Sequence, residues 1–141
     1  GYGLTKMIVT TPFLSEIRSS TQYLTSSGGV LTFENLKLIS ENFNSDYISS
    51  GDFNMTVNSQ TLSVLANRLS VGFYGGVCEF KGSNLIAQHV QIFHRSSHDM
   101  IVNPQQSLEG EILSVGDVIS IQTPAVVDVE QYYTGQLLFL D

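Results

Sequence analysis

Short apolar runs separated by glycines and polar residues follow one another along the whole chain. Phe53, Met55 and Val57 alternate with polar neighbours, as in a strand that turns one face to a core. Runs of strand length at this spacing predict an all-β sandwich or barrel. The predicted strands are residues 7–11, 30–33, 36–39, 52–57, 62–65, 69–73, 77–80, 85–94, 107–113, 118–122 and 132–140.

Two segments depart from simple alternation. Residues 63–70 place Leu65 and Leu69 at helical spacing, but the stretch is too short for a stable helix, so we favour a strand or a single helical turn. Residues 137–140 are all apolar, and such a run must be covered on both sides, by a loop or by another subunit. We find no internal repeat or linker, and expect one domain spanning residues 1–141.

Composition supports a β domain with polar but uncharged outer faces. Hydrophobic residues make up 42% of the 141 residues and charged residues 13%, about half the usual share of roughly 25%. The many aromatic and β-branched residues argue against a disordered chain. A helical bundle would need long stretches of Ala, Glu, Lys and Leu, and none occurs.

Charge and cysteine content argue against some classes of binding partner and bear on the cellular compartment. The net charge of −7, with six Lys and Arg, argues against nucleic acid and against an anionic membrane surface. No apolar run approaches the roughly 18 residues of a membrane span. Cys78 is alone and forms no internal disulfide, which fits a cytosolic, a virion or an extracellular protein. The opening Gly1-Tyr2-Gly3 suggests the C-terminal part of a longer protein, or a processed end.

One cluster of titratable residues could hold a metal ion. It contains His89, His94, His98 and Asp99. His89 and His94 are an odd number of residues apart, so a regular strand points them to opposite faces. We therefore favour polar residues at a strand end and predict no metal site.

No catalytic or cofactor site is predicted either. Cys78 stands beside apolar residues and the anionic Glu79, a setting that disfavours a reactive thiolate. Asp46 and Asp52 flank a loop that could bind calcium weakly, although turn roles fit them better. Asn54 begins a glycosylation sequon inside a predicted strand.

Polar loops offer a second kind of site. Residues 40–50, 58–61 and 95–106 could form a rim that binds a receptor or a glycan, because loops on a rigid sandwich are common recognition surfaces. Ordinary solvated connections are the alternative.

Two C-terminal stretches resemble a known family. Residues 108–122 pass through Gly116-Asp117 into an apolar strand, and residues 133–139 read aromatic-x-Gly-x-Leu-Leu-aromatic. Together they resemble the end of C1q/TNF-like domains. Residues 44–53 echo that family's Asn-x-x-Tyr…Gly-x-Phe stretch, whereas its Gly-aromatic-Tyr-x-Phe strand is only approximated.

The resemblance implies a ten-stranded jelly-roll β-sandwich that forms a homotrimer. In that family the closing strand lies near the three-fold axis, which would explain the apolar run at 137–140. Tyr133, Leu137 and Phe139 are therefore carried over as candidate trimer contacts, with ordinary core residues as the alternative. Such trimers cap a fibrous stalk, and the N-terminus would stand where the stalk ends.

Three functions remain open at this point. The absent tryptophan, few cations and Ser/Thr/Asn-rich loops favour the trimeric head of a viral or phage spike or fibre, such as a tailless-phage vertex spike. That head would attach the virion surface to a host receptor or glycan, and contact other virion proteins through its stalk. The second function is a secreted C1q-like ligand. The third is a carbohydrate-binding sandwich or an enzyme on that fold.

Overall fold

The computed structural model describes residues 8, 10–11, 14–18, 23–24, 30–40, 56–58, 63–75 and 79–141. The all-β prediction is confirmed: the described residues form a ten-stranded sheet. They contain no helix long and apolar enough to cross a membrane. The strands are β1 (Glu16–Arg18), β2 (Tyr23–Leu24), β3 (Val30–Ser40), β4 (Thr56–Asn58), β5 (Ser63–Phe73), β6 (Glu79–His94), β7 (Met100–Ile112), β8 (Val118–Ser120), β9 (Val126–Gln131) and β10 (Leu137–Phe139).

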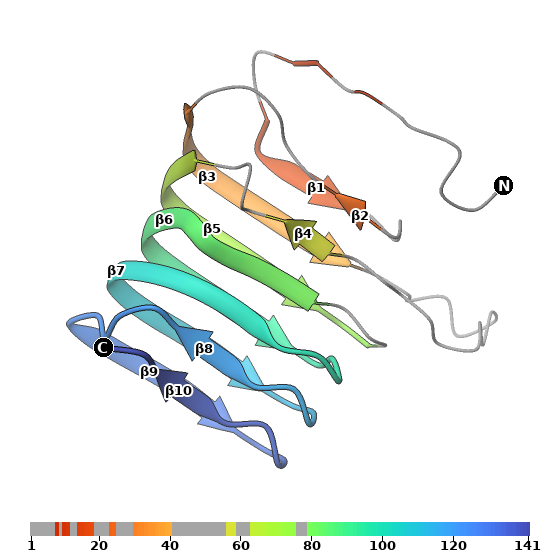
Figure 1. Cartoon of the computed structure of the whole chain (residues 1–141), viewed down its shortest axis with the longest axis vertical. Helices are drawn as coiled ribbons and strands as arrows, with labels where there is room; N and C mark the ends of the chain where they lie inside the picture. Colours follow the sequence, from red (N-terminus) through yellow and green to blue (C-terminus); the bar gives the residue numbers. More distant parts are fainter. Residues whose placement is uncertain are drawn as a thin grey trace, which may run out of the picture.

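Every strand pairing among the described residues is parallel. A jelly roll is built from antiparallel strands joined by hairpins and long connections, so the predicted C1q/TNF-like sandwich is wrong. The chain instead winds as a parallel β-solenoid, in which each turn stacks on the one before (Figure 1). Gly116-Asp117, part of the segment that resembles the end of C1q/TNF-like domains, lies at the corner between β7 and β8, two strands that pair in parallel.

Two stacks of strands form the solenoid (Figure 1). One contains β3, β5, β9 and the C-terminal parts of β6 and β7. The other contains β2, β4, β8, β10 and the N-terminal parts of β6 and β7. The long strand β6 belongs to both, because residues 79–81 pair with β4 and residues 85–94 pair along β5.

The later turns, from β6 onward, repeat at a nearly constant length. Phe80 pairs with Met100, Met100 with Val118 and Val118 with Leu137, so successive turns take 20, 18 and 19 residues. The sequence analysis missed this repeat. Its matched positions share only an apolar side chain, which no search for recurring residue types detects.

Side chains at matched positions stack in rows along the solenoid. One inward row contains Leu36, Leu69, Val90 and Leu108, all buried. Burial of each such side chain contributes about 1.5–3 kcal/mol before the cost of ordering the chain. These rows are the main attraction between successive turns. The neighbouring inward rows contain Leu38, Val71 and Ile92, and Phe73, His94 and Ile112.

Gly110 sits where one of these rows needs a residue without a side chain. Its φ of +135° is a conformation that L side chains rarely adopt. A Cβ there would lie 1.9 Å from the carbonyl oxygen of Ile92 on β6. Glycine therefore lets β7 keep its pairing with β6 at this point.

Several predicted elements were close in position but wrong in extent. Three pairs of predicted strands merge into β3, β5 and β6: 30–33 with 36–39, 62–65 with 69–73, and 77–80 with 85–94. Strands β3 and β5 pair with each other along nearly their whole length, and β6 passes from one stack to the other without breaking. Residues 63–70 are strand throughout, so the helical turn is excluded.

The remaining differences lie in the later turns. The predicted loop at 95–106 is wrong beyond residue 99, because β7 begins at Met100. The sequence analysis missed β9 and gave β10 too many residues. Of the predicted strand 7–11, residues 8, 10 and 11 are described and are not strand. Of the predicted strand 52–57, residues 52–55 lie outside the described residues, and 56–57 belong to β4.

Candidate binding surface

Charge is distributed unevenly along the solenoid. All six Lys and Arg residues precede Ser96, together with six acidic residues. The seven acidic residues that follow Arg95 have no cation among them, so residues 96–141 carry the whole net charge of −7. These residues form β7 to β10, the C-terminal turns in Figure 1.

Four of these carboxylates stand in two facing pairs on the outer surface. Glu109 on β7 is the register partner of Asp128 on β9, and Glu111 is the partner of Glu130. All four alternate with the inward positions of their strands, and all but the half-buried Glu111 are exposed. Adjacent strands lie about 4.8 Å apart, so each pair sets like charges opposite one another, an unfavourable arrangement. Earlier turns fill the first of these rows with Lys37, Ser70 and Gln91.

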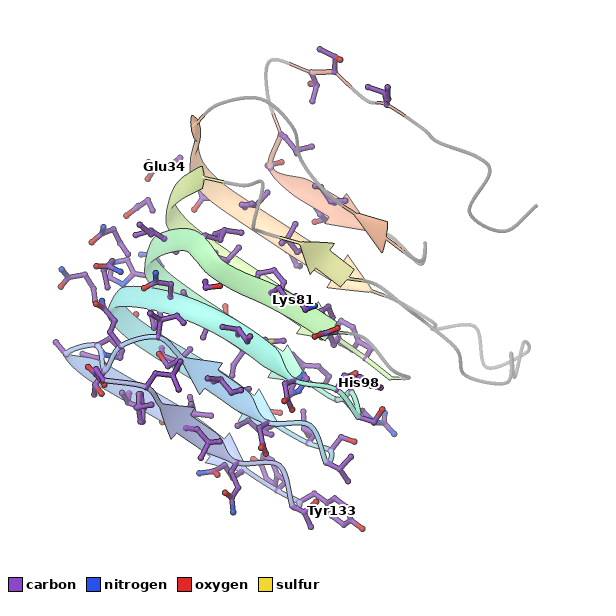
Figure 2. The ribbon with its side chains drawn as sticks, viewed as in Figure 1. Glu34, Lys81, His98 and Tyr133 are labelled. Atoms are coloured by element: carbon purple, nitrogen blue, oxygen red, sulfur yellow. The ribbon has the colours of Figure 1, made fainter. Side chains whose placement is uncertain are left out.

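Exposed apolar side chains gather on the same end. Among the described residues the large exposed apolar side chains are concentrated in residues 126–141, which we call the terminal turn. Val126 is 51% exposed, Tyr133 68% and Leu140 65%. Figure 2 shows Tyr133 at the end of the solenoid remote from Glu34. The others in the terminal turn are Val127, Tyr132 and Leu138.

The terminal turn also carries strand edges with pairing on one side only. Within the described part of the chain, β9 pairs only with β7, and β10 only with β8. The outer edge of β9 therefore presents backbone N–H and C=O groups over six residues. The strand edges and most of the exposed apolar side chains thus lie in the terminal turn, which also supplies one carboxylate to each acidic pair.

Hydrogen bonds hold this surface in place. At its corner, the N–H of Asp117 donates to Oδ1 of Asp99 (3.0 Å), and the N–H of Gln136 donates to Oδ1 of Asp117 (2.8 Å). At the chain end, the backbone N–H and the hydroxyl of Thr123 both donate to the carboxylate of Asp141, which lowers the pKa of Asp141. These bonds tie the terminal turn to the turn before it.

His94 lies deep behind the corner between β6 and β7. Its side chain is fully buried, 6.0 Å from the Phe73 ring between ring centroids. Neither ring nitrogen makes a hydrogen bond in the described structure. Loss of hydration lowers the pKa of His94 to about 4, and the His98 carbonyl and the Asp99 and Asp117 carboxylates offset only part of that effect. His94 is thus a neutral core residue.

The other histidines are placed apart from it. His89 lies on an outward row of β6 and shares a 2.9 Å hydrogen bond with the Ser107 hydroxyl. His98 is exposed at the corner before β7 (Figure 2). Within the described residues no three His, Cys, Asp or Glu side chains come close enough to hold a metal ion. Cys78, Asp46, Asp52 and Asn54 lie outside the described residues.

The three candidate trimer contacts all fall in the terminal turn. Tyr133 lies in the exposed connection between β9 and β10. Leu137 and Phe139 are half-buried, and Leu137 packs against the core. Leu138 and Leu140 are exposed, so the apolar run does alternate in burial. The homotrimer contact through Tyr133, Leu137 and Phe139 stays a prediction.

Comparison with protein families gives a match over most of the chain. Residues 1–124 match the family described as "Putative auto-transporter adhesin, head GIN domain". The chain belongs to this family. The match overturns the resemblance to C1q/TNF-like domains, and with it the tailless-phage spike that this resemblance suggested. No curated protein and no solved structure matches the chain.

The family description bears on location and on the surface described above. An adhesin head indicates a cell-surface or extracellular location, and nothing in the match points to a virion. The match ends at residue 124, before β9, so the terminal turn lies beyond the matched residues. The sequence analysis missed the acidic pairs, although the absence of Lys and Arg after Arg95 signals an acidic end.

Proposed function

We propose that this chain is the head domain of a cell-surface adhesin, and that it acts by binding rather than by catalysis. The observation that carries the proposal is the family match over residues 1–124, whose description is that of an adhesin head. The architecture supports it, because a solenoid of stacked rows gives a rigid platform with a long exposed surface.

We place the attachment surface at the terminal turn. Exposed apolar patches with charged surroundings commonly mark binding sites, and this end combines Val126, Tyr133 and Leu140 with the two acidic pairs. The predicted loop rim has less support, because most of residues 95–106 belong to β7.

Bead adhesion tests the proposed function. Beads coated with the chain are incubated with a panel of cultured cells, beside beads coated at equal density with an unrelated acidic protein. We expect adhesion above the acidic control on at least one cell type, and competition by the soluble chain. Adhesion equal to the control on every cell type would contradict an adhesin role.

A further inference from the structure

The edge of β9 carries only acidic charges, so it repels an acidic strand and not a cationic one. Exposed edges are normally blunted by charged residues, especially Lys, by Pro or by bulges. Strand β9 (Val-Val-Asp-Val-Glu-Gln) contains neither Lys nor Pro, and Val126 and Val127 are exposed. This edge is therefore suited to accept another strand.

The rows of the solenoid specify what that strand should carry. Val127 and Val129 continue inward rows from Leu108 and Gly110, whereas Asp128 and Glu130 continue the acidic outward rows. A strand added in parallel would place alternate side chains beside the two valines and the intervening ones beside the two acids. Apolar side chains would pack beside the two valines. Lysine or arginine would form ion pairs beside the two acids and relieve the repulsion within the acidic pairs.

A second copy of this chain fits the edge poorly. Two β9 edges facing each other would bring together turns that each carry only negative charge. Head-to-tail stacking would continue the rows into β1, which has Ile17 in the row of Val129 but Glu16 in the row of Asp128. Glu16 would then stand opposite Asp128, so head-to-tail stacking sets two like charges against one another.

We propose that β9 captures an extended polypeptide segment by strand addition, and that this segment alternates cationic and apolar residues. Backbone hydrogen bonds to the edge of β9 supply affinity, and Asp128 and Glu130 select the cations. The inference rests on the proposed function only in naming this segment as the adhesin's ligand; the binding itself is independent of adhesion.

The test is calorimetric titration of the folded chain with a capped Lys-Val-Lys-Val-Lys-Val peptide, which matches β9 in length. Laid in parallel register, it sets valines beside Val127 and Val129. Its lysines then stand beside Asp128 and Glu130. Two control peptides separate the contribution of backbone pairing from that of the alternating residue order. One carries N-methyl groups on alternate amides, which keeps the charge but blocks strand pairing. The other has the same composition in the order Val-Val-Val-Lys-Lys-Lys. We expect binding of the first peptide alone; equal binding of the N-methylated peptide would overturn strand addition.

Paired variants test the site. Asp128→Asn with Glu130→Gln should weaken binding of the alternating peptide about twofold to thirtyfold, since two opposite-charge pairs are lost. Glu34→Gln on β3, which removes the same kind of charge from an exposed residue elsewhere, should leave the affinity unchanged. Circular dichroism confirms that each variant is folded. Equal affinity for the double variant and the parent chain would contradict the proposal.

The outcomes separate the two proposals. Beads that adhere to cells while the peptide fails to bind would overturn strand capture and leave the adhesin role standing. Peptide binding without bead adhesion would support strand capture and contradict the adhesin role. Adhesion that is blocked by a free glycan and unaffected by the peptide would overturn strand capture as the attachment mode.

Discussion

The backbone N–H of Gln136 donates a 2.8 Å hydrogen bond to Oδ1 of Asp117, one turn earlier in the solenoid. The N–H of Asp117 makes the equivalent bond to Asp99, at 3.0 Å. At this corner, the backbone N–H of each residue donates to the aspartate side chain at the equivalent position one turn earlier. This ladder holds the terminal turn against β8, because the N–H of Val118 also donates to the carbonyl of Gln136.

Removing the acceptor should loosen the terminal turn. Asp117→Ala removes the acceptor of the exposed N–H of Gln136, which water can then hydrate, at an expected cost of about 0.5–1.5 kcal/mol. Asp117→Asn keeps a side-chain oxygen and should cost less. Asp128→Ala, which removes an exposed carboxylate without such a bond, is the matched control. Urea unfolding measures all three, and equal midpoints for Asp117→Ala and Asp128→Ala would contradict the ladder.

Gly110→Ala tests the packing between β6 and β7. The added Cβ meets the carbonyl oxygen of Ile92 at a φ of +135°, so we expect a loss of about 3 kcal/mol or more. Gly75→Ala is the control, because a Cβ there meets nothing within 4 Å. Thermal unfolding midpoints compare the two. A Gly110→Ala midpoint as high as that of Gly75→Ala would mean that β7 does not approach β6 in this way.

Burial of His94 should make the fold sensitive to mild acid. Its pKa is lowered from 6.5 to about 4, so the unfolded chain binds the proton more readily between these values. The stabilisation is present above pH 6.5 and is lost as the pH falls toward 4, by at most about 3 kcal/mol. We expect His94→Leu to lose less stability than the parent chain between pH 7 and pH 4.5, measured by urea unfolding.

The exposed His98 supplies the control for this pH effect. His98→Gln removes an exposed imidazole from the same corner without touching the core. Its stability should fall with pH as the parent's does. Parallel pH curves for the parent chain and His94→Leu would show that His94 is not the group responsible.

Repulsion between the facing carboxylates should lower the stability of the fold, and a single substitution should remove it. Asp128→Lys turns the repulsion with Glu109 into attraction, and we expect a gain of about 0.5–1 kcal/mol at low ionic strength. The gain should shrink in 1 M NaCl, where the screening length falls to about 3 Å. Unfolding in both salt concentrations measures it, and a gain independent of salt would point to a cause other than charge.

The sequence predicted the β class and most strand positions, because alternation within a strand is a local signal. Parallel stacking is not local. It depends on matches such as Phe80 with Met100 and Val118 with Leu137, whose side chains share only their apolar character. Gly116-Asp117 contributed to the wrong resemblance to C1q/TNF-like domains, because a solenoid corner and a β-hairpin can use the same turn residues.

The binding surface was predictable only in part. The apolar run at 137–140 was expected to be covered on both sides, whereas Leu138 and Leu140 are exposed and the run alternates in burial. The acidic pairs could not be foreseen, because Glu109 and Asp128 are neighbours only after one full turn of the solenoid. Their pairing follows from the fold and not from any spacing that the sequence displays.

The direction of strand pairing is the central claim, and backbone NOEs from a nuclear magnetic resonance spectrum test it most directly. In a parallel solenoid, contacts between β6 and β7 advance together along both strands, from His89 with Ser107 to Gln91 with Glu109 and Phe93 with Glu111. We expect that pattern. Contacts that advance along β6 while retreating along β7 would show antiparallel pairing and would contradict the solenoid, together with the terminal turn built on it.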